Sequence, residues 1–229
     1  MKNLFALILT TFFTLQFTCI SHQSFSQFRI WSHDFGGVGN NDNGQAVAVD
    51  NDNNVLFTGV YNGRCDFDPS SDSAILHSTN LANDFNLFIA KYDEEGNYVW
   101  AHGIGGAGIE FAKDIGTDDE GNVYVYGDFT SFYPTNSFAD FDPSSDTAFL
   151  KTHGNNSRQD IFLAKYDKDG AFVWAHAVGG NQADFARSMS VTSDGTIYIT
   201  GIFMDSVDFD PGANKAIGHA VNNHVFIAK

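Results

Sequence analysis

The stretch Tyr98–Gly106, which reads YVWAHGIGG, decides the fold because related copies precede and follow it in the chain. The earlier copy, residues 30–37, reads IWSHDFGG, and the later copy, residues 172–180, reads FVWAHAVGG. All three tryptophans of the protein lie in these copies, at positions 31, 100 and 174. The chain is therefore built from a repeated unit.

Two further markers recur in the same order around these copies. The motif Asp-Phe-Asp-Pro occurs at residues 66–69, 140–143 and 208–211. A segment that begins Phe-Ile-Ala-Lys or Phe-Leu-Ala-Lys occurs at residues 88–93, 162–167 and 226–229. Because successive tryptophans are 69 and 74 residues apart, the repeat is about 70 residues long.

Each repeat contains four short segments that are rich in apolar and β-branched residues and are bounded by Gly, Asn or Asp. Such segments are typical of strands. In the second repeat we expect strands at residues 112–117, 122–130, 160–167 and 171–179. Residues 118–121 and 167–170 have the composition of hairpin turns, and residues 131–159 form a longer connecting loop.

The pattern predicts an all-β fold. No helical periodicity appears outside the first residues, so we do not expect a parallel sheet with crossover helices. A four-stranded antiparallel unit that repeats along the chain is typical of a β-propeller blade. We therefore expect about three blades of four antiparallel strands, which is a partial propeller, with the paired glycines turning the chain toward the next blade.

These motifs together resemble the bacterial SBBP, or seven-bladed β-propeller, repeat. The resemblance rests on Trp-x-His with a trailing Gly-Gly, on the strand at residues 121–127, on Asp-Phe-Asp-Pro and on the segment at residues 160–167. It covers residues 29–229. It implies a secreted or surface-exposed bacterial propeller, although the family's name implies about seven blades and this chain offers three.

The order of the strands predicts how the blades are completed. The chain starts with a strand of the kind that forms the outer edge of a blade, at about residues 28–35. Three sets of three inner strands and two more outer strands follow. The first strand would complete the last blade as a closing clasp. Three blades are too few for a closed ring, since propellers have about four to eight. We expect either a fragment of a longer protein or a half-ring that self-associates.

The first residues predict export. Lys2 precedes an apolar run, and Ser24 and Ser26 place small residues where a signal peptidase cleaves, so residues 1–26 are expected to be a signal peptide. The run is shorter than the ~20 residues that a membrane span needs. Residues 27–229 would form the propeller repeat region, without a transmembrane segment, secreted or at the cell surface.

The composition narrows the class of partner. The 229 residues carry a formal net charge of −16, which repels phosphate backbones and excludes nucleic acid as a partner. A protein or glycan ligand, or a divalent cation, is compatible with this charge. Aromatic residues make up 15% of the chain and include 23 phenylalanines, which is ample material for a core.

The Asp-Phe-Asp-Pro motifs are candidate calcium sites. Aspartates two apart in an extended segment share one face, and calcium takes carboxylate oxygens in irregular loops. Alternatively, the phenylalanines anchor the core while the aspartates cap a turn. Calcium would be the sole cofactor, and its candidate ligands are Asp66, Asp68, Asp72, Asp140, Asp142, Asp146, Asp208 and Asp210.

Catalysis has little support in the sequence. Gly-x-Ser-x-Gly and His-Glu-x-x-His are absent, and the carboxylate pairs recur once per repeat, which is typical of a structural role. The recurring His33, His102 and His176 are likewise expected to be structural, and Lys91, Lys165 and Lys229 to run along the blade surface. We expect a non-catalytic scaffold that presents loops to a protein or a glycan. The alternative is an extracellular polysaccharide hydrolase or lyase.

Overall fold

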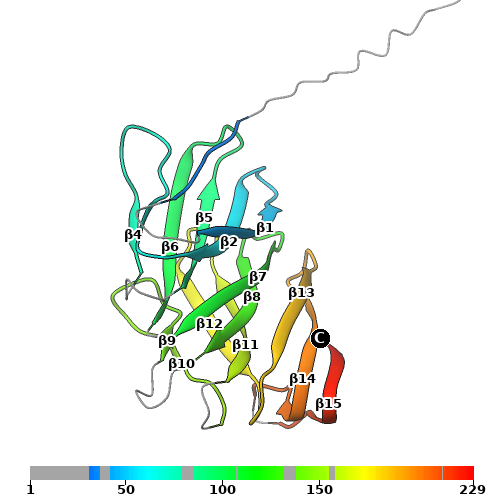
Figure 1. Cartoon of the computed structure of the whole chain (residues 1–229). Helices are drawn as coiled ribbons and strands as arrows, with labels where there is room; N and C mark the ends of the chain where they lie inside the picture. Colours follow the sequence, from blue (N-terminus) through cyan, green and yellow to red (C-terminus); the bar gives the residue numbers. More distant parts are fainter. Residues whose placement is uncertain are drawn as a thin grey trace, which may run out of the picture. The chain divides into compact units, whose positions relative to one another are not determined.

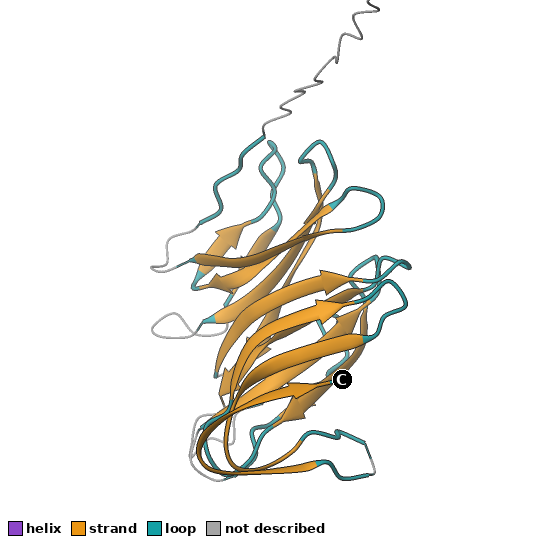
Figure 2. Cartoon of the chain, turned by 90° about the vertical axis from the view of Figure 1, so that its right-hand side faces the viewer, coloured by secondary structure: helices purple, strands orange, loops and turns teal. Residues whose placement is uncertain are grey.

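Strands in antiparallel pairs make up the described part of the chain. The computed structural model describes residues 31–36, 42–78, 85–106, 108–130, 138–154, 158–212 and 214–229. The chain divides into two units, Met1–Ile30 and Trp31–Lys229, and all described residues lie in the second. These residues contain strands and loops but no helix (Figure 2). The predicted signal peptide, residues 1–26, lies outside them.

Three sheets follow one another along the chain and are named here the first, second and third blade (Figure 1). The first blade has the order β1 (Asn43–Val49), β2 (Val55–Tyr61), β5 (Asn86–Tyr92) and β6 (Tyr98–Gly106). The second has the order β7 (Ile109–Thr117), β8 (Val123–Thr130), β11 (Gln159–Tyr166) and β12 (Phe172–Val178). The third consists of β13 (Phe185–Val191), β14 (Ile197–Asp208) and β15 (Ile217–Ala228). The predicted all-β partial propeller is confirmed.

The innermost strands bring successive blades together. β1 of the first blade contacts β7 of the second, and β7 contacts β13 of the third. The core lies between the blades, because side chains on facing sheets pack together: Ile89 and Leu56 meet Ile115 at the first junction, and Tyr126 meets Ile199 at the second. β7 therefore lies between two neighbouring blades, whereas β1 at the end of the series is largely exposed.

The long connecting loop contains structure that the sequence did not predict. β9 (Ala139–Asp140) and β10 (Phe149–Leu150) form a small hairpin within residues 131–159, and β9 pairs with the end of β6. The first repeat has the same hairpin in β3 (Arg64–Asp66) and β4 (Ile75–His77). In the third repeat it merges with the long β14 and β15. Each hairpin turns at Asp-Phe-Asp-Pro.

The predicted closing clasp does not form in the described chain. Residues 31–36 belong to no strand, and the third blade has three strands. The segment lies instead against the first blade, where Trp31 donates from Nε1 to the carbonyl of Glu94 at 3.2 Å. The predicted pairing with the last blade does not occur because each Trp-x-His segment contacts the blade that follows it in the sequence. For Trp31 that blade is the first one.

Candidate functional site

A tryptophan, a histidine and a glycine form the contact between one outer segment and the next blade. The rings of Trp31 and His33 stack at 5.1 Å over the turn between β5 and β6, and His33 Nε2 lies 2.9 Å from the carbonyl oxygen of Gly96. Gly96 has a φ of 84°, and a Cβ atom there would lie 2.7 Å from Cδ2 of Trp31. Only glycine fits this turn beneath the indole.

The second blade repeats this contact. Trp100 on β6 donates from Nε1 to the carbonyl of Lys168 at 3.4 Å, and its ring stacks on His102 at 5.0 Å. Gly170 in the turn between β11 and β12 has a φ of 84° and lies beneath both rings. Burial lowers the pKa of His102, which favours the neutral imidazole. The predicted structural role of these histidines therefore has a physical basis.

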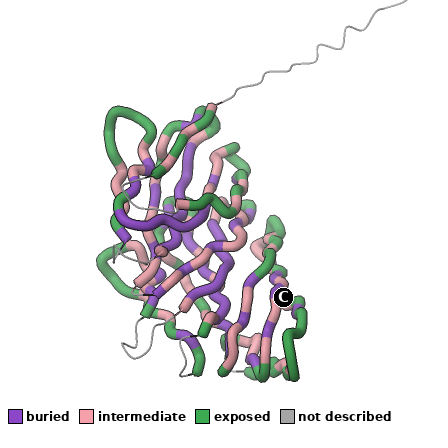
Figure 3. The backbone as a smooth tube through the Cα atoms, in the orientation of Figure 1, coloured by how far each residue is buried: buried purple, intermediate pink, exposed green. Residues whose placement is uncertain are grey.

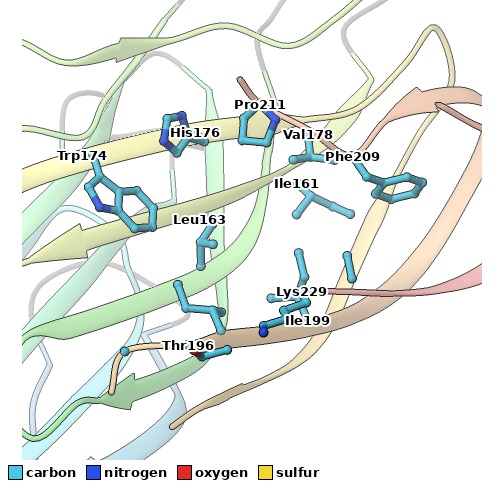
Figure 4. A pocket seen from close by; sticks show the side chains of 13 residues that line it. Ile161, Leu163, Trp174, His176, Val178, Thr196, Ile199, Phe209, Pro211 and Lys229 are labelled. Atoms are coloured by element: carbon cyan, nitrogen blue, oxygen red, sulfur yellow. The ribbon is translucent and has the colours of Figure 1, made fainter. Parts of the chain in front are cut away.

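The third Trp-His pair has no such turn beneath it among the described residues. The described residues of the third repeat include no positions that correspond to residues 166–172. A pocket of about 470 Å³ lies there instead, between the second and third blades (Figure 4). His176 is exposed, whereas His33 and His102 are half-buried. The lining includes Leu163, Trp174, His176, Ile197, Phe209 and Lys229.

The strand beside this pocket has an open edge. β15 pairs with β14 on one side and with no described strand on the other. Val225 and Ile227 are 78% and 80% exposed, whereas Leu87 and Ile89, at the same positions of the first blade, are 1% and 0% exposed. Figure 3 shows the exposed backbone of this last strand in green. The equivalence of these positions follows from the strand pairings Gly59 with Phe88, Gly127 with Phe162 and Gly201 with Phe226.

In each of the first two blades, a tyrosine hydroxyl donates a hydrogen bond to the Asp-Phe-Asp-Pro loop. Tyr92 donates to the carbonyl of Phe67 at 2.8 Å, and Tyr166 donates to the carbonyl of Phe141 at 2.9 Å. Both phenylalanines belong to Asp-Phe-Asp-Pro and are buried. Phe209 has this position in the third repeat, where it lines the open pocket, and no described tyrosine takes the place of Tyr92 or Tyr166.

The aspartates of Asp-Phe-Asp-Pro cap the hairpin turns. Asp66 Oδ1 accepts hydrogen bonds from the backbone amides of Asp68 and Ala74, at 3.2 and 2.8 Å. Asp68 and Ser70 continue the pattern, with Asp68 Oδ1 accepting from the amide of Ser70 and Ser70 Oγ accepting from the amide of Asp72. Asp140, Asp142 and Asp146 repeat these bonds, and Asp208 and Asp210 repeat most of them.

These hydrogen bonds explain why aspartate recurs in the turns, where its carboxylate caps backbone amides. Within the described ranges, no group of three or more His, Cys, Asp or Glu side chains is arranged to hold a metal ion. The bond from the amide of Ala216 lowers the pKa of Asp208, which is consistent with an ionised cap. Calcium binding at these aspartates remains a prediction.

Buried carboxyl groups at the blade junctions were missed by the sequence reasoning. Asp184 accepts from the amides of Gly180 and Met204, at 2.8 and 2.9 Å, and burial raises its pKa to about 6. Asp160 is fully buried, and its Oδ2 accepts from the amide of His153 at 2.6 Å. The spacing Gly-Gly-x-x-x-Asp at Gly180 and Asp184 was the signal that could have found this contact. The role of the Asp184 carboxyl group is to hold the turn between the second and third blades through these hydrogen bonds.

The recurring lysine of the inner strand is buried in the first blade, contrary to the prediction that it runs along the surface. Lys91 Nζ lies 2.9 Å from Asp50 Oδ2 and donates to the carbonyl of Lys168 at 3.2 Å. The pairing with Asp50 compensates for the burial of the ammonium group. Lys165 contacts Asp118 at 3.8 Å and is half-buried, whereas Lys229 at the open pocket is exposed. The burial of this lysine therefore differs between the three repeats.

Comparison with known proteins agrees with the repeat architecture. No protein-family model matches the chain. The chain is 30% identical over 180 residues to the uncharacterized WD repeat-containing protein L264 of Acanthamoeba polyphaga mimivirus. The match covers 77% of this chain and 12% of that protein. With the all-β structure, this similarity supports a β-propeller-like repeat protein. The described residues include no helix that is long and apolar enough to span a membrane.

Proposed function

We propose that the chain is a non-catalytic, exported β-propeller-like scaffold that binds a protein partner through the open side of its third blade. The observation that carries this proposal is the coincidence of an unpaired strand edge with an apolar pocket. β15 offers backbone amides and carbonyls, and the pocket beside Trp174 offers room for side chains. An extended peptide that adds a strand to such an edge gains affinity from the main chain and specificity from the pocket.

The exposed side chains of β15 favour a protein over a glycan at this site. Val221, Val225 and Ile227 are 93%, 78% and 80% exposed. The positions of Val225 and Ile227 are covered in the first blade, where Leu87 and Ile89 are buried in the core with the second blade. A strand with apolar side chains provides the same cover, whereas a glycan offers hydroxyl groups that these residues cannot pair with.

Export and the bacterial SBBP type are further parts of the proposal, and they rest on sequence. Residues 1–26 have the order of a signal peptide, and the motifs at residues 29–229 resemble the SBBP repeat. Fusion of residues 1–26 to a reporter enzyme in a bacterial host tests the export. We expect the reporter outside the cytoplasm, and its retention inside the cell would reject the signal peptide.

Self-association is a second candidate mode of binding. Exposed apolar side chains on the first blade, at the opposite end from β15, favour it. Val47 and Val49 on β1 are 65% and 57% exposed, whereas Ile115, at the position of Val47 in the second blade, is buried against the first blade. Each end of the three blades thus exposes residues that an internal junction buries. Two copies joined end to end would bring together six blades, a number within the range of known propellers.

A display library of random 13-residue peptides, selected on the full chain, tests the proposed function. We expect enriched peptides with alternating apolar residues whose binding is lost in the Ile227→Asp variant and kept in the Val47→Asp variant. Ile227 is exposed, so its substitution leaves the core intact. Enriched peptides that bind both variants equally, or a failure to enrich any peptide, would argue against the open edge as a binding site.

The glycan and enzyme alternatives are decided by two parallel measurements. A glycan array shows whether the chain binds sugars, and a reducing-sugar assay with extracellular polysaccharides shows whether it cleaves them. We expect no release of reducing ends. Release that depends on the chain would overturn the non-catalytic scaffold, and glycan binding that survives Ile227→Asp would place the binding surface elsewhere.

A further inference from the structure

We propose that the contact between the second and third blades is a pH-sensitive joint, which holds the third blade in mildly acidic surroundings and loosens it above neutral pH. This property is separate from the binding role proposed above. Three buried carboxyl groups lie at the junction, and they belong to Asp128 on β8, to Asp160 on β11 and to Asp184, which directly precedes β13. These residues are 1%, 0% and 0% exposed, so water does not stabilise their charges.

Two of the carboxyl groups tie the third blade to the second. Asp128 Oδ1 accepts a hydrogen bond from the amide of Ala186 on β13. Asp184 accepts from the amide of Gly180, in the segment that follows β12, and from the amide of Met204 on β14, at 2.8 and 2.9 Å. A change in the charge of these carboxyl groups therefore acts where the two blades meet.

Asp160 and Asp184 lie against one Gly-Gly step of the chain. A Cβ atom on Gly179 would overlap Cγ of Asp160, and the amide of Gly180 donates to Asp184. Asp160 Oδ1 is buried and has no hydrogen-bond partner among the described residues. Burial raises the pKa of Asp184 to about 6, and the charge of Asp160 contributes to this shift. Burial likewise raises the pKa of Asp160.

The groups that face these carboxyl groups add to the effect of pH. Lys113 Nζ lies 3.5 Å from Oδ2 of Asp128, and His153 Nδ1 lies 2.7 Å from Oδ2 of Asp160. The bond with Asp160 raises the pKa of His153, and the imidazole loses its charge as the pH rises through that value. A rise in pH thus adds negative charge at Asp184 and removes positive charge at His153. The other titratable or charged groups at the junction are Asp114 on β7, Tyr126 on β8, Arg187 on β13 and Asp208 on β14.

The direction of the pH effect follows from these shifts. When the blades separate, water reaches the carboxyl groups, and their pKa values return toward 3.8, the ordinary value of aspartate. The closed junction therefore holds protons that the open junction releases. Its stability is complete below about pH 3.8 and is lost as the pH rises through 6, where Asp184 ionises, and further as His153 loses its proton.

The junction between the first and second blades has the same geometry and fewer carboxyl groups. A Cβ atom on Gly105, the counterpart of Gly179, would overlap the side chains of Glu110 and Asn86. The strand pairings and the position after the paired glycines make Val60, Asn86 and Glu110 the counterparts of Asp128, Asp160 and Asp184. One carboxyl group, an amide and a valine thus replace three carboxyl groups, and we expect no comparable loosening at the first junction.

Hydrogen–deuterium exchange of the full chain at about pH 5, 6.5 and 8 tests the joint, with each rate divided by the intrinsic exchange rate at that pH. We expect the protection of β13 and β14 to fall by about tenfold or more between pH 5 and 8, because a shift of one pKa unit changes an equilibrium tenfold. β2 and β5 of the first blade are the internal reference, and their protection should stay within about threefold.

Two variants remove one buried charge each and keep an oxygen that accepts from the backbone amides. Asp160→Asn introduces the residue that the first junction has as Asn86, and Asp184→Asn removes the other charge at the Gly-Gly step. Either variant should reduce the change in protection of β13 and β14 to about threefold or less. Asp169→Asn is the charge-matched control, because its carboxyl group is exposed, and it should keep the response of wild type. If one of the two variants does not fold, the other still decides.

Three results would overturn the inference. One is protection of β13 and β14 that stays constant from pH 5 to 8. Another is a loss of protection that β2 and β5 share, since the whole chain and not one junction would then respond. The third is a wild-type response in both Asp160→Asn and Asp184→Asn, which would show that these carboxyl groups do not control the joint. Peptide binding at β15 is measured separately with the display library, so neither result decides the other.

Discussion

Trp100 on the outer strand of the first blade donates a hydrogen bond from Nε1 to the carbonyl of Lys168 in the second blade, at 3.4 Å. Trp31 and Glu94 make the same contact one repeat earlier, at 3.2 Å. The motif that sets the period of the chain is therefore the connector between blades. Trp174 carries the third connector, and the open pocket is the place where its turn is missing from the described chain.

Substitution of Gly170 tests this connector. Its φ of 84° disfavours a side chain, and a Cβ atom there would meet the rings of Trp100 and His102. We expect Gly170→Ala to lower the free energy of unfolding by about 1–3 kcal/mol. Gly36→Ala is the matched control, since its Cβ atom would lie 3.5 Å from its nearest contact, Asp42 Oδ2. Chemical denaturation measures both, and equal stability of the two variants would contradict the connector.

The buried ion pair of Lys91 and Asp50 predicts a second effect. Lys91→Met leaves the buried carboxylate without its cation, so we expect a loss of about 2–4 kcal/mol, of which Asp50→Asn in the same chain restores a part. The control is Lys168→Met, because the pair of Lys168 with Asp169 is exposed and solvent screens such pairs, so its loss should change the stability little. Thermal or chemical denaturation of wild type and the three variants checks the ranking. A Lys91→Met variant as stable as Lys168→Met would show that the pair is not buried in solution.

The pH dependence of stability follows from Asp184. Its pKa is raised from 3.8 to about 6, chiefly by burial, so its stabilising contribution is complete below pH 3.8 and is lost as the pH rises through 6. His153 shifts in the same sense, because its bond with Asp160 raises its pKa. We expect Asp184→Asn to flatten the stability profile between pH 4 and 7, by on the order of 1 kcal/mol. Parallel profiles of wild type and variant would show that Asp184 is not buried as described.

Two variants of Asp140 distinguish the capping role of the Asp-Phe-Asp-Pro aspartates from calcium binding. Asp140→Ala removes the acceptor for the amides of Asp142 and Ala148, and we expect a loss of about 1 kcal/mol in the presence of a chelator. Asp140→Asn keeps an oxygen acceptor and removes the charge that calcium requires, so in chelator it should resemble wild type. A melting temperature of wild type that does not change on chelation would remove the calcium prediction.

The strands and their period were predictable because they depend on local pattern. β7, β8, β11 and β12 begin and end within three residues of the expected strands. The turns at residues 118–121 and 167–170 carry Asp and Gly, whose preferences act within a few residues. The hairpin of β9 and β10 was not predictable in this way, since each strand has two residues. β9 pairs with Gly105 and Gly106 at the end of β6, and β10 pairs with β9.

The site was only partly predictable, because it depends on contacts between repeats. Trp174 and His176 were recognised as repeated residues, but their neighbours Ile197 and Phe209 come from the next blade, and no local pattern joins them. Lys91 was expected at the surface since its charge alone indicates exposure. Its partner Asp50 lies 41 residues away, at the end of another strand. The clasp at residues 28–35 was wrong for the same reason: pairing of an edge depends on geometry between blades.

Hydrogen–deuterium exchange of β15 tests most directly whether the open side of the third blade accepts the strand of a partner. Val225 and Ile227 lie on β15, which pairs with β14 on one side and with no described strand on the other, and β1 at the opposite end serves as the internal control. With an excess of a peptide enriched from the library, exchange in β15 should slow by about tenfold or more while β1 is unchanged. Exchange in β15 that stays the same at the highest peptide concentration would contradict strand addition at this edge.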